Sequence, residues 1–197
     1  MKVLIVGHHV ENVTLAFRQR GHLVSPVEPL ADGLSKSVVH RVGYDLLIAF
    51  PPCKYLCSSG LHWNSRVPGR AAQTESALEF VRWLMDLPIT RICIENPVGC
   101  LSSRIRRPDQ MIHPHQFGHD ASKKTCLWLT NLPHLVPTQH VAPRYVATGR
   151  GTQTLPRWGN QFDSGQNNQV NAPDRGRARA ERWQGVADAM AEQWGVL

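Results

Sequence analysis

A cysteine and a glutamate follow two short apolar runs of this 197-residue chain, and their chemistry is complementary. The run DLLIAFPPC ends in Cys53, and the run RICIENP carries Glu95 near its end. A cysteine thiolate is an effective nucleophile near neutral pH. A carboxyl group beside it can hold or donate a proton to the group under attack. The two residues together therefore indicate nucleophilic catalysis assisted by an acid.

The two apolar runs must form elements that bring these residues together. Each run has the length and the continuous apolar character of a strand buried in a parallel α/β sheet. Ligands of such sheets bind at the carboxyl ends of the strands, so we expect Cys53 and Glu95 to face one pocket. Each residue also has a purely structural alternative. Cys53 would then be a small apolar residue after a Pro–Pro turn, and Glu95 would cap backbone amides.

The same residues carry a family resemblance. The Pro-Pro-Cys of residues 51–53 and the Glu-Asn-Pro of residues 95–97 resemble the Pro-Pro-Cys and Glu-Asn-Val signatures of the cytosine-5 DNA methyltransferases. A compact, mostly phage-borne branch of that family is the most similar, over nearly the whole chain. The matching stretches are 45–60, 91–98, 116–118, 124–129, 163–167 and 185–195.

The resemblance implies a fold and a mechanism. The fold class is α/β, a Rossmann-like S-adenosylmethionine-dependent methyltransferase fold with a reduced or absent target-recognition domain. The Cys53 thiolate would add to carbon 6 of cytosine, so that carbon 5 becomes nucleophilic and accepts a methyl group. Glu95 would hydrogen-bond the exocyclic amine and keep a proton for ring nitrogen 3. Asn96 and Pro52 would shape the two turns.

The first 28 residues predict a cofactor half-site. Residues 2–7 are predicted to form a strand, 10–20 a helix and 23–28 a second strand ending in an acid. In half-sites with this order the first turn lies against the cofactor, and the acid after the second strand accepts hydrogen bonds from ribose hydroxyls. The residues expected to contact S-adenosylmethionine are Gly7, His8, Glu11, Glu28 and Pro51.

The half-site departs from the family pattern in two places. The first turn, GHHVEN, contains one glycine, and bulkier residues limit close approach of the backbone to a ligand. Asp32 is the only acid between Glu28 and Asp45, where related proteins have an acid that contacts adenine. The half-site is therefore either competent or degenerate.

Basic residues indicate a polyanionic partner, which the resemblance identifies as double- or single-stranded DNA. The net charge is +7 and the pI is about 9.5. Lys123 and Lys124 precede a predicted strand over 125–129, where the larger enzymes have a basic pair that contacts the target nucleotide. A run of arginines would neutralise phosphates, and its members are Arg175, Arg177, Arg179 and Arg182. A solvated strand edge and a solvated helix start are the alternatives.

The chain is divided into three predicted parts. Residues 1–138 form the catalytic core, 139–182 an irregular basic arm that could contact DNA, and 183–197 a helix packed on the core. Within the core, 71–87 is the clearest helix. Residues 54–70 are expected to be a mobile loop that closes over a base flipped out of the DNA duplex.

Bulk properties exclude several classes of protein. No apolar run is long enough to span a membrane, and the amino-terminal run is too short for a signal peptide. Five cysteines without paired zinc spacing indicate reduced thiols and a cytoplasmic location, in the host if the protein is phage-encoded. Four histidines lack the partners of a metal site, so no metal is expected; they are His113, His115, His119 and His134.

The favoured function is S-adenosylmethionine-dependent methylation of cytosine carbon 5 in DNA through a covalent adduct of Cys53. A catalytically degenerate protein that binds DNA or a host enzyme is one alternative. The other is a related cytosine-modifying enzyme that uses another donor or a mononucleotide.

Overall fold

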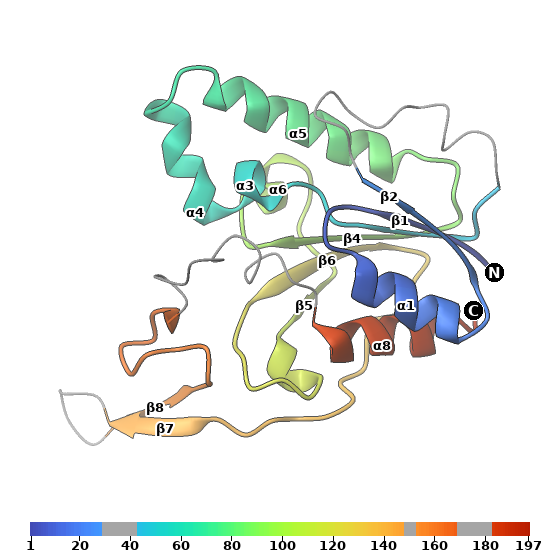
Figure 1. Cartoon of the computed structure of the whole chain (residues 1–197). Helices are drawn as coiled ribbons and strands as arrows, with labels where there is room; N and C mark the ends of the chain where they lie inside the picture. The colour runs from blue at the N-terminus through green and yellow to red at the C-terminus, as the bar shows by residue number, and fades with distance from the viewer. Residues whose placement is uncertain (29–42, 148–152, 169–182) are drawn as a thin grey trace.

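A computed structural model describes residues 1–28, 43–147, 153–168 and 183–197 (Figure 1). Its centre is a six-stranded sheet of order β2-β1-β3-β4-β6-β5, and a separate two-stranded sheet pairs β7 with β8. The strands are β1 Lys2–Val6, β2 Leu23–Val27, β3 Leu46–Ala49, β4 Arg91–Pro97, β5 Gln110–Ile112, β6 Thr125–Thr130, β7 Arg144–Ala147 and β8 Thr154–Arg157. The helices are α1 Glu11–Gln19, α3 Cys53–Leu56, α4 Ser58–Leu61, η1 His62–Ser65, α5 Arg70–Met85, α6 Leu101–Arg104, η2 Pro114–Gln116 and α8 Gln184–Trp194.

The sheet separates two apolar cores, as expected for the α/β class. Alternate residues of the central strands point to opposite faces. One face packs against α1 and α8, with Phe17 and Trp194 as the largest buried side chains from those helices. The other face packs against α5 through residues such as Leu78 and Val81. β1, β3 and β4 are buried on both faces, which is why their sequences are apolar without alternation.

The structure confirms the parallel strands predicted from the two apolar runs. β3 pairs with β4 in parallel, and the register ends at Ala49 opposite Ile94. The predicted strands over 2–7 and 23–28 are β1 and β2, which also pair in parallel. The predicted helices are α1, α5 and α8.

Antiparallel pairing at one edge was not predicted. β6 pairs antiparallel with β4 and with β5, and a network of hydrogen bonds around Asp109 and Arg106 stabilises this edge. Asp109 Oδ2 accepts hydrogen bonds from the Leu129 N–H and the Arg106 guanidinium, both at 2.7 Å. Arg106 also donates to the Leu129 carbonyl at 3.0 Å, and its own carbonyl accepts from the Trp128 indole at 2.8 Å.

The Asp109 carboxyl group in this network predicts a pH-dependent contribution to stability. Burial raises the pKa of Asp109, but the Leu129 N–H and the Arg106 guanidinium outweigh that effect and hold the pKa below its ordinary value of 3.8. A carboxyl with a lowered pKa stabilises the fold above its unfolded-state pKa, and this stabilisation is lost as the pH falls through the folded-state value. We expect Asp109→Asn to lower the free energy of unfolding by about 1 kcal/mol at about pH 7. Urea titrations should show this difference shrinking below about pH 4, and a constant difference would contradict the assignment.

The segment predicted to be a mobile loop, 54–70, is instead three short helical turns, α3, α4 and η1. Side chains from the first turns of α5 hold it. The buried Arg70 guanidinium donates to the Lys54 carbonyl and lies 4.3 Å from the centre of the Tyr55 ring. Thr74 Oγ1 contacts the Tyr55 carbonyl at 3.0 Å and Asn64 Oδ1 at 3.1 Å. The sequence shows no helical periodicity here because these contacts come from outside the segment.

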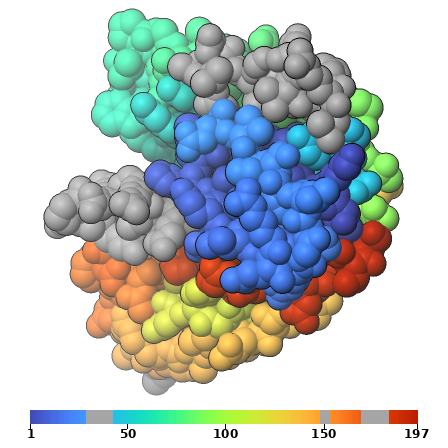
Figure 2. All heavy atoms as spheres, turned by 45° about the vertical axis from the view of Figure 1, so that its right-hand side comes forward, coloured from blue at the N-terminus to red at the C-terminus, as the bar shows by residue number. Residues whose placement is uncertain are grey.

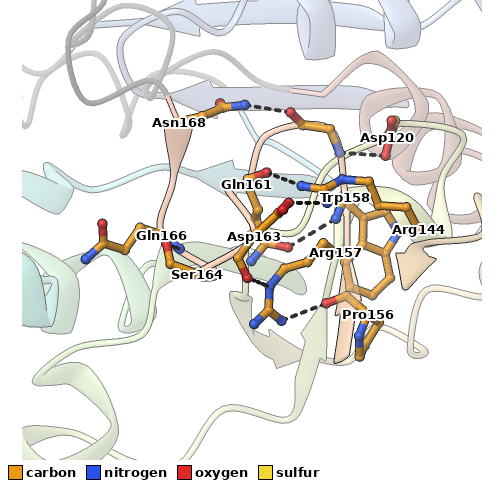
Figure 3. Close-up of polar contacts among 11 residues, drawn as sticks. Asp120, Arg144, Pro156, Arg157, Trp158, Gln161, Asp163, Ser164, Gln166 and Asn168 are labelled. Atoms are coloured by element: carbon orange, nitrogen blue, oxygen red, sulfur yellow. Dashed lines mark hydrogen bonds and ion pairs between the residues drawn. The ribbon is translucent and has the colours of Figure 1, made fainter. Parts of the chain in front are cut away.

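The prediction of irregular structure over 139–182 is wrong for β7 and β8, which form an antiparallel ribbon. Polar contacts at its base replace an apolar core (Figure 3). Arg144 pairs with the Asp163 carboxylate at 2.5 Å and donates to the Gln161 carbonyl at 2.7 Å. Arg157 Nε donates to the Asp163 carbonyl at 3.0 Å. Because these strands bury little, their sequences show no pattern that would predict them.

The ribbon is attached to the core through stacked rings. The Trp158 indole stacks on His115 at 4.1 Å between ring centres and donates Nε1–H to the Val141 carbonyl at 3.1 Å. The Gly159 N–H donates to Asp120 Oδ1 at 2.8 Å. Burial, with His140 nearby, lowers the pKa of His115, so the neutral ring is the form that stacks.

Within the described ranges, no helix has the length and apolar character needed to cross a membrane.

Candidate active site at the carboxyl edge of the sheet

The strand order reverses at β1, which lies between β2 and β3. Open α/β sheets bind ligands outside the carboxyl ends of the strands at such a switch point. The segments at this edge are the turn 7–10 after β1, Glu28 after β2 and residues 50–53 after β3. All of the amino-terminal residues expected in the site stand here or in the first turn of α1.

The Pro-Pro-Cys and Glu-Asn-Pro motifs are joined by one side chain. The buried Asn96 donates Nδ2–H to the Pro51 carbonyl at 3.0 Å. Its Oδ1 is buried and has no hydrogen-bond partner among the described residues. Pro52 is extended, and the half-buried Cys53 begins α3 directly after it. Asn96 therefore fixes the turn that presents the thiol.

A second set of hydrogen bonds holds the carboxyl end of α3, the helix that begins at Cys53. The Ser58 N–H donates to the Val98 carbonyl at 3.0 Å, and the Cys100 N–H donates to the Leu56 carbonyl at 2.9 Å. Gly99 lies between these bonds, where a Cβ would stand 1.9 Å from the Leu56 oxygen. The chain after β4 and the helix after β3 thus form one unit.

Glu95 points to the opposite face of β4 from Asn96, towards α1 and α8. It is 7% exposed and lines a pocket. Lys123 and Thr125 add the polar part of the wall. The remaining walls are apolar except for one indole, and they comprise Val13, Phe50, Ile112, Pro114, Trp183, Val186, Ala187 and Met190. The pocket thus combines a buried carboxyl group, a cation and mostly apolar walls.

The predicted basic residues separate into three groups. Lys123 is half-buried in the cavity wall, whereas Lys124 is exposed beside it. Arg175, Arg177 and Arg179 lie outside the described residues. Cys53 is not among the described residues that line the cavity; it lies beyond Pro51, whose neighbour Phe50 does line it.

The predicted cofactor residues are mostly exposed. His8 Nδ1 lies 3.7 Å from Glu28 Oε2, and both side chains are exposed. Glu11 is exposed in the first turn of α1. Gly7 is buried, and its N–H donates to the Val27 carbonyl at 3.0 Å. Gly7 has a φ of 153°, and a Cβ at this position would lie 2.8 Å from Phe50 Cβ. Close packing of β1 against the end of β3 therefore favours glycine here.

The cysteines differ in environment. Burial raises the pKa of the Cys93 thiol well above its ordinary value, and the Glu95 carboxylate adds to this effect. Burial likewise raises the pKa of Cys100 and Cys126. These three thiols stay protonated near neutral pH, whereas Cys53 and Cys57 are only half-buried.

The sequence assigned only Glu95 and Lys123 of the eleven cavity residues to the site, and Phe50, Thr125 and Trp183 are among the nine that it missed. Phe50 follows Ile48 with the alternation of a strand, and that spacing places both on one face. Thr125 starts a strand that was predicted, directly after the lysine pair. Trp183 Nε1 is buried without a hydrogen-bond partner among the described residues, a property that no sequence pattern reveals.

Metal-binding side chains do not cluster in the described part of the chain, where no group of three or more His, Cys, Asp or Glu residues has a suitable arrangement.

Comparison with protein-family models gives no match, and comparison with curated proteins gives none either. Among solved structures, the chain is similar to an E. coli protein described as a candidate prophage-encoded DNA modification methyltransferase, at 14% identity and a TM-score of 0.44 over 66% of this chain and 46% of that one. It is also similar to a mutant of Spodoptera frugiperda DNMT2, at 16% identity and a TM-score of 0.45 over 71% of this chain and 54% of that one. This chain thus spans about half the length of these two proteins.

Proposed function

We propose that this protein transfers a methyl group from S-adenosylmethionine to carbon 5 of cytosine in DNA. The observation that carries the proposal is the hydrogen bond from Asn96 to the Pro51 carbonyl. It joins a thiol-bearing turn to the strand that carries a buried carboxyl, at the edge of the sheet where ligands bind. A structural cysteine and a capping carboxylate would not require this connection.

The two reactive residues have separate tasks. The Cys53 thiolate adds to carbon 6 of the ring, which moves the electron pair of the carbon 5–carbon 6 bond towards carbon 5. Glu95 would donate a proton or a hydrogen bond to ring nitrogen 3 and so accept the charge that addition creates. After methylation, loss of the carbon 5 proton restores the double bond and expels the thiol.

The residues at the switch point fit the cofactor. The exposed Glu28 carboxylate at the end of β2 is the acceptor that ribose hydroxyls need, and His8 lies beside it. Glu28, His8, Glu11 and Pro51 would hold S-adenosylmethionine, and the close packing of Gly7 shapes the turn between them. The bound cofactor supplies an electrophilic methyl group on a positively charged sulfur.

DNA binding follows from the basic residues and the ribbon. Lys124 is exposed next to the cavity wall, where it would contact a phosphate. A two-stranded antiparallel ribbon has the width that the major groove of DNA admits. The β7–β8 ribbon presents Tyr145 with 67% of its surface exposed, and it would contact the duplex around the target.

Nucleoside mass spectrometry tests the proposal directly. Unmethylated DNA, single- and double-stranded, is incubated with the protein and S-adenosylmethionine, digested and analysed. A 5-methylcytosine peak supports the proposal. A cytosine mass shift other than that of a methyl group would indicate a donor other than S-adenosylmethionine. The absence of any modified nucleoside on both substrates would contradict DNA methylation and favour a DNA-binding protein.

Glu95→Gln isolates the role of the acid. The amide has the same shape but cannot donate the proton, so we expect the rate of methyl transfer to fall about 100-fold or more while the fold is kept. Single-turnover kinetics on a cytosine oligonucleotide measure the loss. Glu79→Gln is a matched control on the exposed side of α5, and it should retain the normal rate. An equal rate for Glu95→Gln would assign the carboxyl a structural role only.

A further inference from the structure

We propose that Trp63 is a stacking platform for an unpaired base, and that the segment 54–67 around it binds single-stranded DNA. The inference rests on the proposed function only in taking DNA as the partner. It requires no methyl transfer and no cofactor.

Trp63 is exposed although it stands on a rigid turn. It is 46% exposed, and Val67 beside it is 44% exposed. The turn η1 is closed by hydrogen bonds from the Arg66 and Val67 N–H groups to the Trp63 carbonyl, both at 3.0 Å. Next to the indole, Asn64 Oδ1 accepts from the buried Thr74 hydroxyl of α5 at 3.1 Å. The partly exposed Trp63 indole is therefore carried by an ordered turn, which loses little conformational entropy when a ligand stacks on the ring.

The charge around the indole selects an anion. Residues 53–74 contain no acidic residue. Of their cations, Lys54 and Arg66 are exposed, whereas Arg70 is buried against the Tyr55 ring. The next acid along the chain, Glu75, is paired through both carboxylate oxygens with Arg104 at 2.9 Å. Exposed cations interleaved with an exposed aromatic ring form the usual surface for single-stranded nucleic acid, where phosphates contact the cations and bases stack on the rings.

The position of the segment matches a strand that passes the active site. η1 follows α4 and α3 without interruption, and α3 begins with Cys53. Figure 1 shows α3 and α4 on the side of the sheet from which the β7–β8 ribbon also projects, with the ribbon at the opposite end of that side. In the space-filling view of Figure 2, these two parts again lie at the upper and lower left. A strand that stacks on Trp63 would thus contact the helical segment that begins at Cys53.

The test measures the affinity of the full chain for a fluorescent 20-nucleotide thymine strand by anisotropy. This probe contains no cytosine, so the result is independent of the methylation chemistry. We expect Trp63→Ala to weaken binding about 5-fold to about 100-fold, the range for loss of one stacked base, and Trp63→Phe to retain most of the affinity. Trp63→Ala should change the affinity for the same strand paired with adenine by less than about twofold, since paired bases are already stacked.

Matched controls lie at the amino ends of β1 and β2. Leu23→Ala removes a side chain that is 69% exposed at the start of β2 and should leave the affinity unchanged. Arg66→Gln should reduce the slope of log affinity against log salt by about 0.7, whereas Lys2→Gln, with the same change in charge, should not.

Two results would overturn the proposal. One is equal affinity of Trp63→Ala and Leu23→Ala for the thymine strand, with both variants folded by circular dichroism. The other is a change in oligomeric state of Trp63→Ala, seen by light scattering, without a change in affinity. That second result would assign the indole to a protein interface.

Discussion

Cys53→Ser is expected to abolish formation of 5-methylcytosine, with a loss of at least about 1,000-fold in rate. A hydroxyl at this position is far less nucleophilic than a thiolate near neutral pH. The measurement is nucleoside mass spectrometry after a single turnover, at equal protein concentration. The same variant should fail to form the covalent complex that the natural protein forms with DNA containing 5-fluorocytosine, in which the carbon 5 fluorine prevents release of the thiol.

Cys57→Ser is the control for this experiment. Cys57 lies one helical turn from Cys53, is equally half-buried, and contacts Ser59 Oγ at 3.2 Å, a contact that a hydroxyl preserves. This variant should methylate and form the 5-fluorocytosine adduct at the normal rate. If Cys57→Ser lost the adduct and Cys53→Ser retained it, the nucleophile would have been assigned to the wrong thiol.

Gly99→Ala is expected to cause the largest loss of stability, about 3 kcal/mol. A Cβ at this position would lie 1.9 Å from the Leu56 oxygen and 2.6 Å from the Cys57 Cα. Both atoms belong to the backbone, so the contact cannot be relieved by a rotamer change. The segment after β4 must then separate from α3, with loss of the bonds that fix the cysteine helix. Urea denaturation followed by circular dichroism measures the change.

Gly43→Ala serves as the reference for the alanine substitution itself. A Cβ at Gly43 would meet no atom of the described residues within 4 Å, so the free energy of unfolding of this variant should change by less than about 0.5 kcal/mol. Gly99→Ala should also alter the rate at which a thiol reagent modifies Cys53, because the helix that carries it shifts. A Gly99→Ala protein as stable as Gly43→Ala would show that the two segments are not tightly joined in solution.

The central strands were predictable for one physical reason. Strands covered by helices on both faces must be apolar throughout, so β3 and β4 stand out as continuous runs. The carboxyl ends of parallel strands share an edge, which is why Cys53 and Glu95 could be expected near each other. The alternation of the strand also separates Glu95 from Asn96. That separation explains why one residue lines the cavity while the other holds the Pro51 turn.

The parts that sequence reasoning missed are held by contacts between distant residues. β5 has three residues and depends on pairing with β6 and on the Asp109 carboxylate. β8 contains Pro156 and has its first three residues exposed, so neither propensity nor periodicity indicates a strand. The helical turns after Cys53 depend on Arg70 and Thr74. In each case, hydrogen bonds between residues distant in the sequence supply the stability that the local sequence lacks.

The packing of α8 against α1 has a consequence for how the protein is made. α8 supplies Val186, Ala187 and Met190 to the cavity, and its Trp194 is buried in the core that α1 begins. At ribosomal rates of roughly 5–20 residues per second, α1 is synthesised roughly 10–35 s before this partner exists. During that interval the apolar side of α1 has no cover from α8. The nascent chain therefore completes this wall of the cavity only after α8 has been synthesised.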